Sequence, residues 1–472
     1  MRKTKIVCTL GPASNSEEMI EQLFISGMNV ARLNFSHGTH KEHKETLERF
    51  RSVRDRLGLP AAILLDTKGP EIRTGLIEGG QTELKEGQTF KLTIQNILGT
   101  NDFVSITYDR LCKLLNPDNT VKIDDGSIIL KVISVCETEI VCKVLVGGIL
   151  KNRKSINIPG INLDMPYLSE KDKEDILFAV ENDIDYIAAS FVRTKKDVTD
   201  LRKFLNYNGG HNIKIIAKIE NSQGVQNFAE ILEESEGIMV ARGDMGVEVE
   251  YEKLPGLQKR FIKTCYGSGK IVITATQMLE SMVHSFNPTR AEITDVANAV
   301  FDGTSAVMLS GETAMGDHPA RVVEVMSKIV CQAESDAISL NMFANRSFVS
   351  EKDVANAICD AACTTAADLK AQAIIAVTKS GHTARRLSKF RPKEPIVAST
   401  PEIKTYHQLS LSWGVHPVLA KNQDSEEKLF LHALDCAKQI DLIKRGDIAV
   451  ILGGAPINVV GNTNMIKVVT SD

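Results

Sequence analysis

Charged and polar side chains, together with one glycine, gather at the ends of short apolar runs in this sequence. They are Arg32, Asn34, Ser36 and His37; Asp66, Thr67, Lys68 and Arg73; Lys218 and Glu220; Arg242, Gly243 and Asp244; and Thr276. Arginines bind phosphate oxygens through paired, charged donors, and carboxylates supply the hard oxygen ligands that Mg²⁺ takes. A lysine beside such a metal stabilises negative charge that develops on a transferred phosphoryl group or on an enolate. Together these residue types predict phosphoryl-transfer chemistry.

Alternation along the apolar runs places several of these side chains on one face. In Ala217-Lys218-Ile219-Glu220 the charged residues alternate with apolar ones, so both charges point to the same side. The same alternation relates Arg32, Asn34 and Ser36. Side chains that share a face and follow buried strands are expected to line a common site.

Each residue also has an alternative role that involves no chemistry. Lys218 could pair with a buried carboxylate, and Arg32 could be structural. Asp244 could cap a helix, while His37 could belong to a turn. Gly243 would let the backbone approach an anion at a helix start.

The sequence around these candidate site residues predicts alternating strands and helices, which must hold the side chains in place. Short, nearly continuous apolar runs are typical of parallel strands buried on both faces. They lie at residues 5–10, 30–33, 61–65, 186–192, 213–219, 237–240, 270–273 and 305–309. Helical patterns lie between several of them, for example at 16–26, 40–57, 170–181, 195–206 and 289–301. Eight such units predict an α/β fold, a (β/α)₈ TIM barrel whose active site lies at the carboxyl ends of the strands.

Two further segments depart from this rhythm. Alternating strands between Pro70 and Pro166 predict an all-β domain inserted after the third strand, here called the insert (residues 70–166). The barrel would then comprise residues 1–69 and 167–340. After a polar linker at 341–351, apolar helices and strands restart and predict an open α/β domain, the C-terminal domain (residues 341–472).

The composition and charge of the chain limit the classes of partner that can be expected for it. The formal net charge is −4 and charged residues make up 25% of the 472 residues, which argues against a nucleic acid or a membrane surface as the main partner. Apolar runs are too short to span a bilayer and no signal-peptide core is present, so a cytoplasmic protein is expected. The nine cysteines contain no Cys-x-x-Cys pair, which favours reduced thiols.

A segment that resembles a phosphate-binding loop is a decoy. Gly267-Ser268-Gly269-Lys270 resembles the end of a Walker A motif. Ile271 follows where Ser or Thr is needed, and the lysine begins a strand rather than a helix. The phosphate-loop interpretation therefore fails.

Several motifs together resemble the pyruvate kinase family. They occur in the family's order along the whole chain: Lys5-Ile6-Val7-Cys8-Thr9-Leu10-Gly11-Pro12-Ala13-Ser14, Ala31-Arg32-Leu33-Asn34-Phe35-Ser36-His37-Gly38, Leu65-Asp66-Thr67-Lys68-Gly69-Pro70-Glu71-Ile72-Arg73-Thr74-Gly75, Ala217-Lys218-Ile219-Glu220-Asn221, Met239-Val240-Ala241-Arg242-Gly243-Asp244-Met245-Gly246, Ala275-Thr276-Gln277-Met278-Leu279-Glu280-Ser281-Met282 and Leu309-Ser310-Gly311-Glu312-Thr313-Ala314. The resemblance implies transfer of the phosphoryl group of phosphoenolpyruvate to ADP, giving pyruvate and ATP in the last step of glycolysis.

The resemblance also implies a role for each matching residue. Lys218, Arg32 and Thr276 would be catalytic. The substrate would be bound by Arg32, Lys218, Gly243, Asp244 and Thr276. Mg²⁺ (or Mn²⁺) would be held by Glu220 and Asp244, and K⁺ by Asn34, Ser36, Asp66 and Thr67. The nucleotide would be reached by Asn34, His37, Arg73 and Lys154. Glu71 matches the members that need K⁺, and the insert would act as a lid that excludes water.

The C-terminal domain resembles the family's effector domain. Its hydroxyl-rich turn, Thr378, Lys379, Ser380, Gly381, His382 and Thr383, resembles a sugar-phosphate pocket. The alternative is an ordinary helix cap. The loop at 453–461 has no Arg or Trp to hold a second phosphate, so a sugar monophosphate, AMP or no activator at all stay open. A homotetramer is expected from the resemblance.

Two other functions compete. A barrel aldolase that acts on pyruvate enolate would use Lys218 as a Schiff base or Mg²⁺ as a Lewis acid, but it leaves the K⁺ residues and the lid unexplained. A metabolite sensor that has lost turnover would be expected to have an altered Lys218 or metal carboxylate, and both are intact.

Overall fold

Eight parallel strands close into a barrel at the centre of the molecule. The computed structural model describes residues 1–343, 353–456 and 462–472. The barrel strands are β1 (Lys5–Thr9), β2 (Val30–Asn34), β3 (Ala62–Asp66), β13 (Tyr186–Ala189), β14 (Lys214–Ile219), β15 (Gly237–Ala241), β16 (Ile271–Ala275) and β17 (Ala306–Leu309). Closure is complete because β1 pairs with both β2 and β17. The predicted (β/α)₈ barrel is therefore confirmed.

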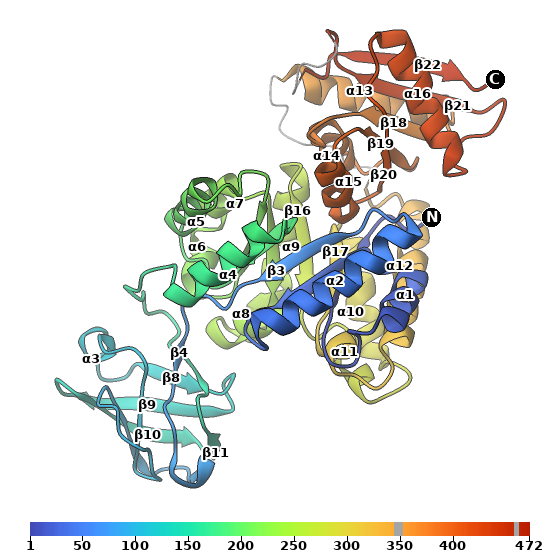
Figure 1. The fold of residues 1–472 in the computed structure, drawn as a ribbon. Helices are drawn as coiled ribbons and strands as arrows, with labels where there is room; N and C mark the ends of the chain where they lie inside the picture. Colours follow the sequence, from blue (N-terminus) through green and yellow to red (C-terminus); the bar gives the residue numbers. More distant parts are fainter. Residues whose placement is uncertain (344–352, 457–461) are drawn as a thin grey trace.

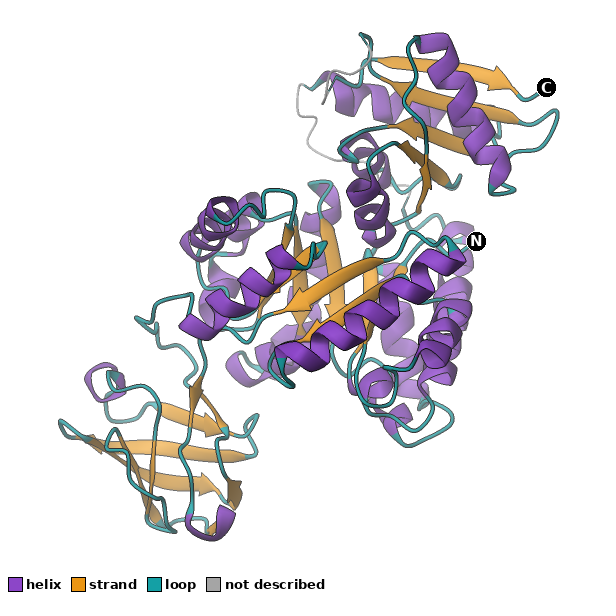
Figure 2. Ribbon diagram, in the orientation of Figure 1, coloured by secondary structure: helices purple, strands orange, loops and turns teal. Residues whose placement is uncertain are grey.

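Helices surround this barrel, as Figures 1 and 2 show. They are α1 (Glu17–Ser26), α2 (His40–Leu57), α4 (Glu170–Glu181), α5 (Lys195–Tyr207), α6 (Ser222–Gln226), α7 (Phe228–Glu234), α8 (Arg242–Glu248), α9 (Leu254–Gly267), α10 (Arg290–Phe301), α11 (Gly311–Ala314) and α12 (Pro319–Ser339). Capping boxes begin α2, α4 and α10. The strands are apolar on both faces because helices cover the outside and side chains fill the inside.

The end of one barrel strand differs from the sequence prediction by three residues, more than at any other barrel strand. The run at 186–192 predicts a strand to its end, but β13 stops at Ala189. Ser190 then begins a turn in which Phe191 has φ 53°, a left-handed conformation that no strand adopts. Because residues 186–192 are mostly apolar, the sequence gives no sign that the strand ends at Ala189.

The insert forms its own sheet between β3 and β13. Seven strands have the order β4 (Ile72–Arg73), β12 (Ser155–Asn157), β8 (Thr120–Ile123), β9 (Ile128–Val135), β10 (Glu139–Val146), β6 (Thr89–Thr93) and β7 (Phe103–Ser105). Outside this sheet, β5 (Gln81–Leu84) pairs with β11 (Gly148–Lys151), and α3 (Leu111–Leu114) is a single turn. A separate hydrophobic cluster fills the insert. Alternation in the sequence indicates strands at 89–94, 103–107, 120–123, 128–134 and 140–146, but it gives no signal for β4, β5, β11 and β12.

The C-terminal domain contains a five-stranded sheet. Its order is β20 (Val415–Leu419), β19 (Ile396–Thr400), β18 (Ala373–Val377), β21 (Ile448–Gly453) and β22 (Met465–Thr470). The helices are α13 (Val354–Asp368), α14 (His382–Lys389), α15 (Ile403–Gln408) and α16 (Glu426–Gln439). Apolar runs in the sequence indicate strands at 373–377, 396–399, 447–452 and 465–469, but not β20, an edge strand that contains Pro417. Most of the predicted linker at 341–351 lies outside the described residues.

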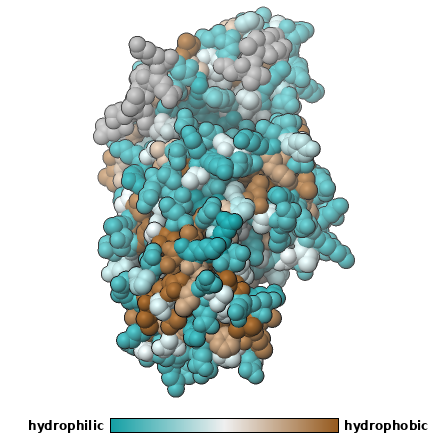
Figure 3. Space-filling model, turned by 90° about the vertical axis from the view of Figure 1, so that its left-hand side faces the viewer, coloured by the Kyte–Doolittle hydropathy of each residue, from teal (hydrophilic) through white to brown (hydrophobic). Residues whose placement is uncertain are grey.

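The three parts lie in a row, with the insert and the C-terminal domain on opposite ends of the barrel (Figure 1). Turning the molecule brings the insert to the front, where apolar side chains gather in the lower part of Figure 3. Exposed apolar residues of the insert are Leu76, Ile97, Leu98, Ile133, Leu145, Val146 and Ile149. No helix in the described part of the chain has the length and apolarity that a membrane span requires.

Candidate active site

Lys218 lies at the centre of a buried polar cluster at the carboxyl end of β14. Its Nζ is 2.9 Å from Asp66 Oδ1, 3.0 Å from Glu220 Oε1 and 2.8 Å from Ser190 Oγ. Burial alone would lower the pKa of this lysine, but the charges of Asp66 and Glu220 outweigh it and raise the pKa above the usual value. Lys218 is therefore a fixed positive charge in a site that excludes most water.

Arg32 joins the cluster from β2. Its Nε donates to Asp66 Oδ2 at 2.7 Å and its Nη1 donates to Thr9 Oγ1 at 2.9 Å. Asp66 is only 1% exposed, and burial would raise its pKa. Arg32 and Lys218 nevertheless hold the pKa of Asp66 below its usual value. One carboxylate thus orients both cations, as expected from the shared face predicted for the strand ends.

Two carboxylates lie beside the lysine. Burial raises the pKa of Glu220 to about 7, and burial also raises the pKa of Asp244. Asp244 lies in the first turn of α8, whose N-cap is Ala241, so the capping role considered for it is wrong. No group of three acidic, histidine or cysteine side chains that could hold a metal occurs within the described ranges. Two carboxylates are still enough for Mg²⁺, which completes its shell with water and substrate oxygens.

Thr276 ends β16 in a strained turn. Its φ is 68° and that of Gln277 is 54°, values that are unusual for residues with a side chain. The Thr276 hydroxyl accepts a hydrogen bond from Gly243 N at 2.9 Å. Arg242 supports the turn from the other side: its guanidinium donates to Thr276 O at 2.6 Å and pairs with Asp295 at 2.6 Å. The predicted substrate-carboxylate residues are therefore adjacent.

The predicted K⁺ ligands lie on neighbouring loops. Asn34 and Asp66 are register partners at the ends of β2 and β3. Ser36 follows in the same loop, and its N–H donates to Asn34 Oδ1 at 3.2 Å. The Thr67 hydroxyl accepts from Ser190 N at 3.2 Å. The four residues thus lie at the carboxyl ends of two adjacent barrel strands, or directly after them.

Three of the four predicted nucleotide residues lie away from these central contacts, whereas the fourth, Asn34, ends β2 beside Asp66. His37 is exposed, and its carbonyl accepts from His43 Nε2. Arg73, on β4 of the insert, pairs with Glu71 at 2.8 Å. Lys154, on the insert, pairs with Asp124 at 2.8 Å. The structure does not bring these three into contact with one another.

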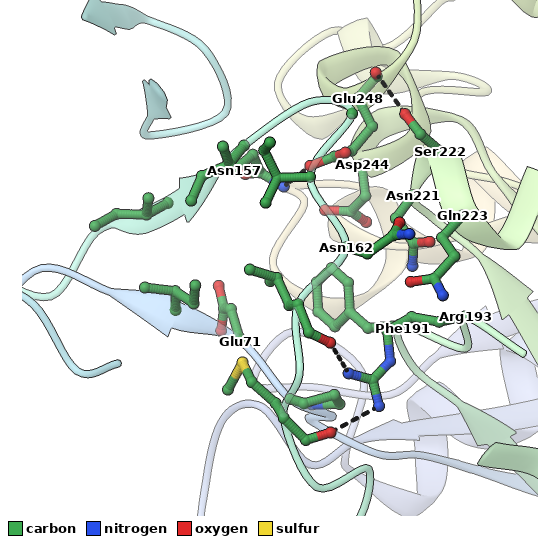
Figure 4. Close-up of a pocket in the computed structure, with 18 of the residues that line it drawn as sticks. Glu71, Asn157, Asn162, Phe191, Arg193, Asn221, Ser222, Gln223, Asp244 and Glu248 are labelled. Carbon is green, nitrogen blue, oxygen red and sulfur yellow. Dashed lines mark hydrogen bonds between the residues drawn. The ribbon is translucent and has the colours of Figure 1, made fainter. Parts of the chain in front are cut away.

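A cavity separates the insert from the barrel beside Asp244, and Figure 4 shows its lining. Asn157 projects from β12 and donates to Glu248 Oε1 at 3.1 Å. Arg193 donates to the carbonyls of Leu163 and Met165 at 2.9 and 3.0 Å (Figure 4). The cavity therefore has one wall on each part of the chain.

The hydroxyl-rich turn of the C-terminal domain lines a separate cavity. The turn joins β18 to α14, and five of its six predicted residues line the cavity: Thr378, Lys379, Ser380, His382 and Thr383. The sixth, Gly381, has φ 76° and its N–H donates to Thr378 Oγ1 at 3.0 Å. Thr383 and Thr463 hydroxyls are 2.7 Å apart. Residues 457–461 of the closing loop lie outside the described residues.

Ser190 is a site residue that the sequence prediction missed. It is 1% exposed and contacts Lys218, Asp66 and Thr67. The rule that polar residues after a barrel strand face the site would have found it, had the strand been ended at Ala189. Lys270, the decoy lysine, instead donates to the carbonyls of Glu233 and Ser235 at 2.7 and 2.8 Å.

Comparison with known proteins agrees with this geometry. A family model described as pyruvate kinase, barrel domain, matches residues 1–323, and one described as pyruvate kinase, alpha/beta domain, matches residues 356–469. A pyruvate kinase of Clostridium acetobutylicum is 45% identical over 469 residues, which is 99% of each chain. One of Staphylococcus haemolyticus is 47% identical over 469 residues, covering 99% of this chain and 80% of the relative.

A solved structure is also similar. The crystal structure of a pyruvate kinase from Cryptosporidium parvum superposes with a TM-score of 0.94 and 43% identity, covering 100% of this chain and 96% of that one. The family models, the relatives and the shared fold together show that this chain belongs to the pyruvate kinase family.

Proposed function

We propose that the cluster around Lys218 transfers the phosphoryl group of phosphoenolpyruvate to ADP, giving pyruvate and ATP. The chain is a phosphotransferase by its family. The observation that carries the residue assignment is the contact of the Lys218 ammonium with both Asp66 and Glu220 inside a buried site. A permanent positive charge held there stabilises the enolate left behind when the phosphoryl group departs.

Arg32 and Lys218 bind the substrate phosphate in this proposal. Both are oriented by Asp66, so each presents its remaining N–H groups to an incoming anion. On the opposite side, Gly243, Asp244 and Thr276 receive the substrate carboxylate. Support for this comes from the hydrogen bond between Gly243 N and the Thr276 hydroxyl, which defines a compact polar edge.

A divalent metal ion is part of the family's chemistry, and we assign it as Mg²⁺ (or Mn²⁺) on Glu220 and Asp244. Burial raises the pKa of both carboxylates even though the charge of Lys218 acts to lower it. A divalent ion would supply the further positive charge that favours their ionised forms, which supports this site. Bound there, the metal would polarise phosphoryl oxygens.

A monovalent cation is likewise part of the family's chemistry, and we assign K⁺ to Asn34, Ser36, Asp66 and Thr67. Residue 71 is a glutamate, and its carboxylate is paired with Arg73. Glu71 therefore adds no positive charge that could replace the cation, which supports dependence on K⁺.

ADP would reach the site over Asn34, His37, Arg73 and Lys154. Arg73 and Lys154 both belong to the insert, so movement of the insert would bring them toward the phosphates. Closure would exclude water, which competes with ADP for the phosphoryl group.

The C-terminal domain offers a site for a regulatory ligand. The turn with Thr378, Lys379, Ser380, Gly381, His382 and Thr383 offers hydroxyls and a helix start to a sugar phosphate or AMP. A homotetramer and a cytoplasmic location are expected from the family.

The two competing functions lack support. The family models and the two relatives named above cover nearly the whole chain, and all of them are those of pyruvate kinases. The ion pairs of Lys218 with two carboxylates also disfavour a Schiff base, which needs a neutral amine.

The test is pyruvate formation from phosphoenolpyruvate and ADP with Mg²⁺, once in K⁺ buffer and once in Na⁺ buffer. Strong turnover only with K⁺ is expected. Equal turnover in both would remove the K⁺ assignment but keep the reaction. Absence of pyruvate from folded protein in both buffers, with candidate activators added, would contradict the proposed reaction. A Lys218→Met variant should lose turnover while keeping its fold.

A further inference from the structure

The hydroxyl of Ser190 sits between the lysine and the loop that follows β3. Its Oγ is 2.8 Å from Lys218 Nζ, 2.6 Å from the carbonyl oxygen of Thr67 and 3.1 Å from Asp66 Oδ1. The side chain is nearly completely buried. A hydroxyl in such a place must satisfy fixed partners, since water cannot replace them.

Counting protons assigns a direction to each contact. A serine hydroxyl has one proton to donate and two lone pairs to accept with, while a lysine ammonium only donates. The Ser190 hydroxyl donates its hydrogen bond to Thr67 O, the shorter of its contacts to an oxygen, and a lone pair of Ser190 Oγ accepts a hydrogen bond from Lys218 Nζ. Ser190 therefore links the ammonium to the backbone of Thr67.

Phe191, the residue after Ser190, binds Glu220, the carboxylate that pairs with Lys218. Phe191 N donates to Glu220 Oε2 at 2.5 Å, and Phe191 has φ 53°. A left-handed phenylalanine is strained and persists only where its surroundings fix it. The turn of Ser190 and Phe191 thus holds Lys218 with a side chain and Glu220 with a backbone N–H.

A close approach of two loops makes these contacts fit. A Cβ added to Gly69 would lie 2.8 Å from the carbonyl oxygen of Ser190 and 2.9 Å from its Cβ. Only glycine lets the loop after β3 lie against the turn after β13. The position of Ser190 is therefore set by the loop that carries Thr67.

We propose that Ser190 is a positioning residue for the phosphoryl-transfer step: its hydroxyl fixes the Lys218 ammonium and ties that position to the loop of Asp66 and Thr67. The inference rests on the function proposed for Lys218. Because Thr67 and Asp66 are proposed K⁺ ligands, the placement of the lysine responds to the cation through Ser190.

The test compares Ser190→Cys and Ser190→Ala with the unaltered enzyme. A thiol keeps the shape of the side chain but is a weak acceptor. Both variants should lose kcat by roughly tenfold or more, the effect of one hydrogen bond to a charged group. The KM for phosphoenolpyruvate should change less than kcat, because Arg32 and the carboxylate-binding residues are untouched. The K⁺ concentration for half-activation should rise severalfold.

A matched control is Ser235→Ala. Ser235 is also buried, and its hydroxyl donates to Ile231 O at 2.9 Å near the start of β15, at the other end of the barrel from the site. This variant should keep kcat and K⁺ activation. Thermal unfolding midpoints of all variants report whether a loss of kcat accompanies a loss of fold.

The outcomes separate the inference from the function on which it rests. Wild-type kcat in Ser190→Cys would overturn the proposal. Together with a loss in Ser190→Ala it would show that only packing matters, and without such a loss it would show that the side chain is dispensable. Unchanged K⁺ half-activation in both variants would overturn the coupling. Full turnover in Lys218→Met would instead contradict the role proposed for the lysine itself.

Discussion

At the scale of single residues, the balance of charge explains why the site is built from so many ionised groups. Two cations, Arg32 and Lys218, face three carboxylates, Asp66, Glu220 and Asp244. Buried ions are costly unless each is paired. The excess of one negative charge is removed when a divalent cation binds, and the site then becomes positive toward an anionic substrate. Metal and substrate are thus expected to bind cooperatively.

The raised pKa of Glu220 predicts that Mg²⁺ binding depends on pH. A protonated carboxyl does not bind the metal, and the pKa of this group is about 7. We therefore expect Mg²⁺ to bind about tenfold more weakly at pH 6 than at pH 8, as one proton must leave for each ion bound. Isothermal titration in two buffers of different ionisation enthalpy measures the affinity and counts that proton. Equal affinity at both pH values would contradict the assignment.

We expect a change at Arg242 to affect catalysis although Arg242 is not proposed to contact the substrate, because it supports the turn of Thr276. Its guanidinium holds Thr276 O and pairs with Asp295. Arg242→Lys removes the fork that makes both contacts. Loss of charge-assisted hydrogen bonds worth about 1.5–3 kcal/mol should lower kcat/KM for phosphoenolpyruvate by roughly tenfold to a hundredfold.

The matched variant is Arg202→Lys. Arg202 also joins a carbonyl, Ile213 O at 2.7 Å, to a carboxylate, Glu236, but at the amino end of β14. Steady-state kinetics should show little change in this control. An equal loss in both variants would mean that the effect is on folding rather than on Thr276.

At the scale of elements, glycines decide how closely the loops above the barrel pack. Gly69 has φ 72° and meets Ser190, whereas Gly58, at the end of α2, has φ 65° and nothing within 4 Å. Gly58→Ala should cost about 1 kcal/mol from the left-handed backbone alone. Gly69→Ala adds a clash with backbone and should cost clearly more in urea unfolding. It should also lower kcat through Ser190, and similar costs for the two variants would show that the loops separate freely.

The sequence predicted the barrel well because its strands are uniformly apolar and its helices carry capping boxes at residues such as Thr39 and Thr289. Lys218, Glu220 and Arg32 were found from alternation along those strands. Ser190 and the strained turn of Thr276 were not predicted, because positive φ at a non-glycine residue leaves no mark in composition. Short strands such as β4 and β12 depend on pairing partners far along the chain. Roles for Lys154 and the effector turn rest on motif resemblance.

At the scale of the whole molecule, the insert contacts the barrel through the same helix that carries a proposed metal ligand. Asn157 donates to Glu248 Oε1, and Lys122 donates to Val247 O at 2.5 Å. Both acceptors end α8, which begins beside Asp244. Movement of the insert is therefore connected to the metal site by less than two turns of helix.

Asn157→Asp tests this connection. It places a carboxylate against Glu248 and should disfavour the contact by about 1 kcal/mol or more. We expect a higher KM for ADP and more pyruvate formed in the absence of ADP, because an open insert admits water. Asn162→Asp, which adds the same charge to the same cavity wall, should have a smaller effect. Identical kinetics in both variants would exclude Asn157 as a closing contact.

The pairing of β4 with β12 also bears on how the chain folds. β3 and β13 are neighbours in the barrel, yet the whole insert separates them in sequence. Arg73 pairs with Ser155 and Ile72 with Ile156, which brings the two ends of the insert together. Once the insert has folded around its own core, its two ends lie side by side and β3 is joined to β13 by a compact unit. The conformational entropy of the 70–166 segment is then lost before β3 pairs with β13, so this pairing no longer has to close a long flexible loop. Folding of the insert before barrel closure would therefore speed the slowest pairing step of the barrel, since non-local contacts limit folding rates.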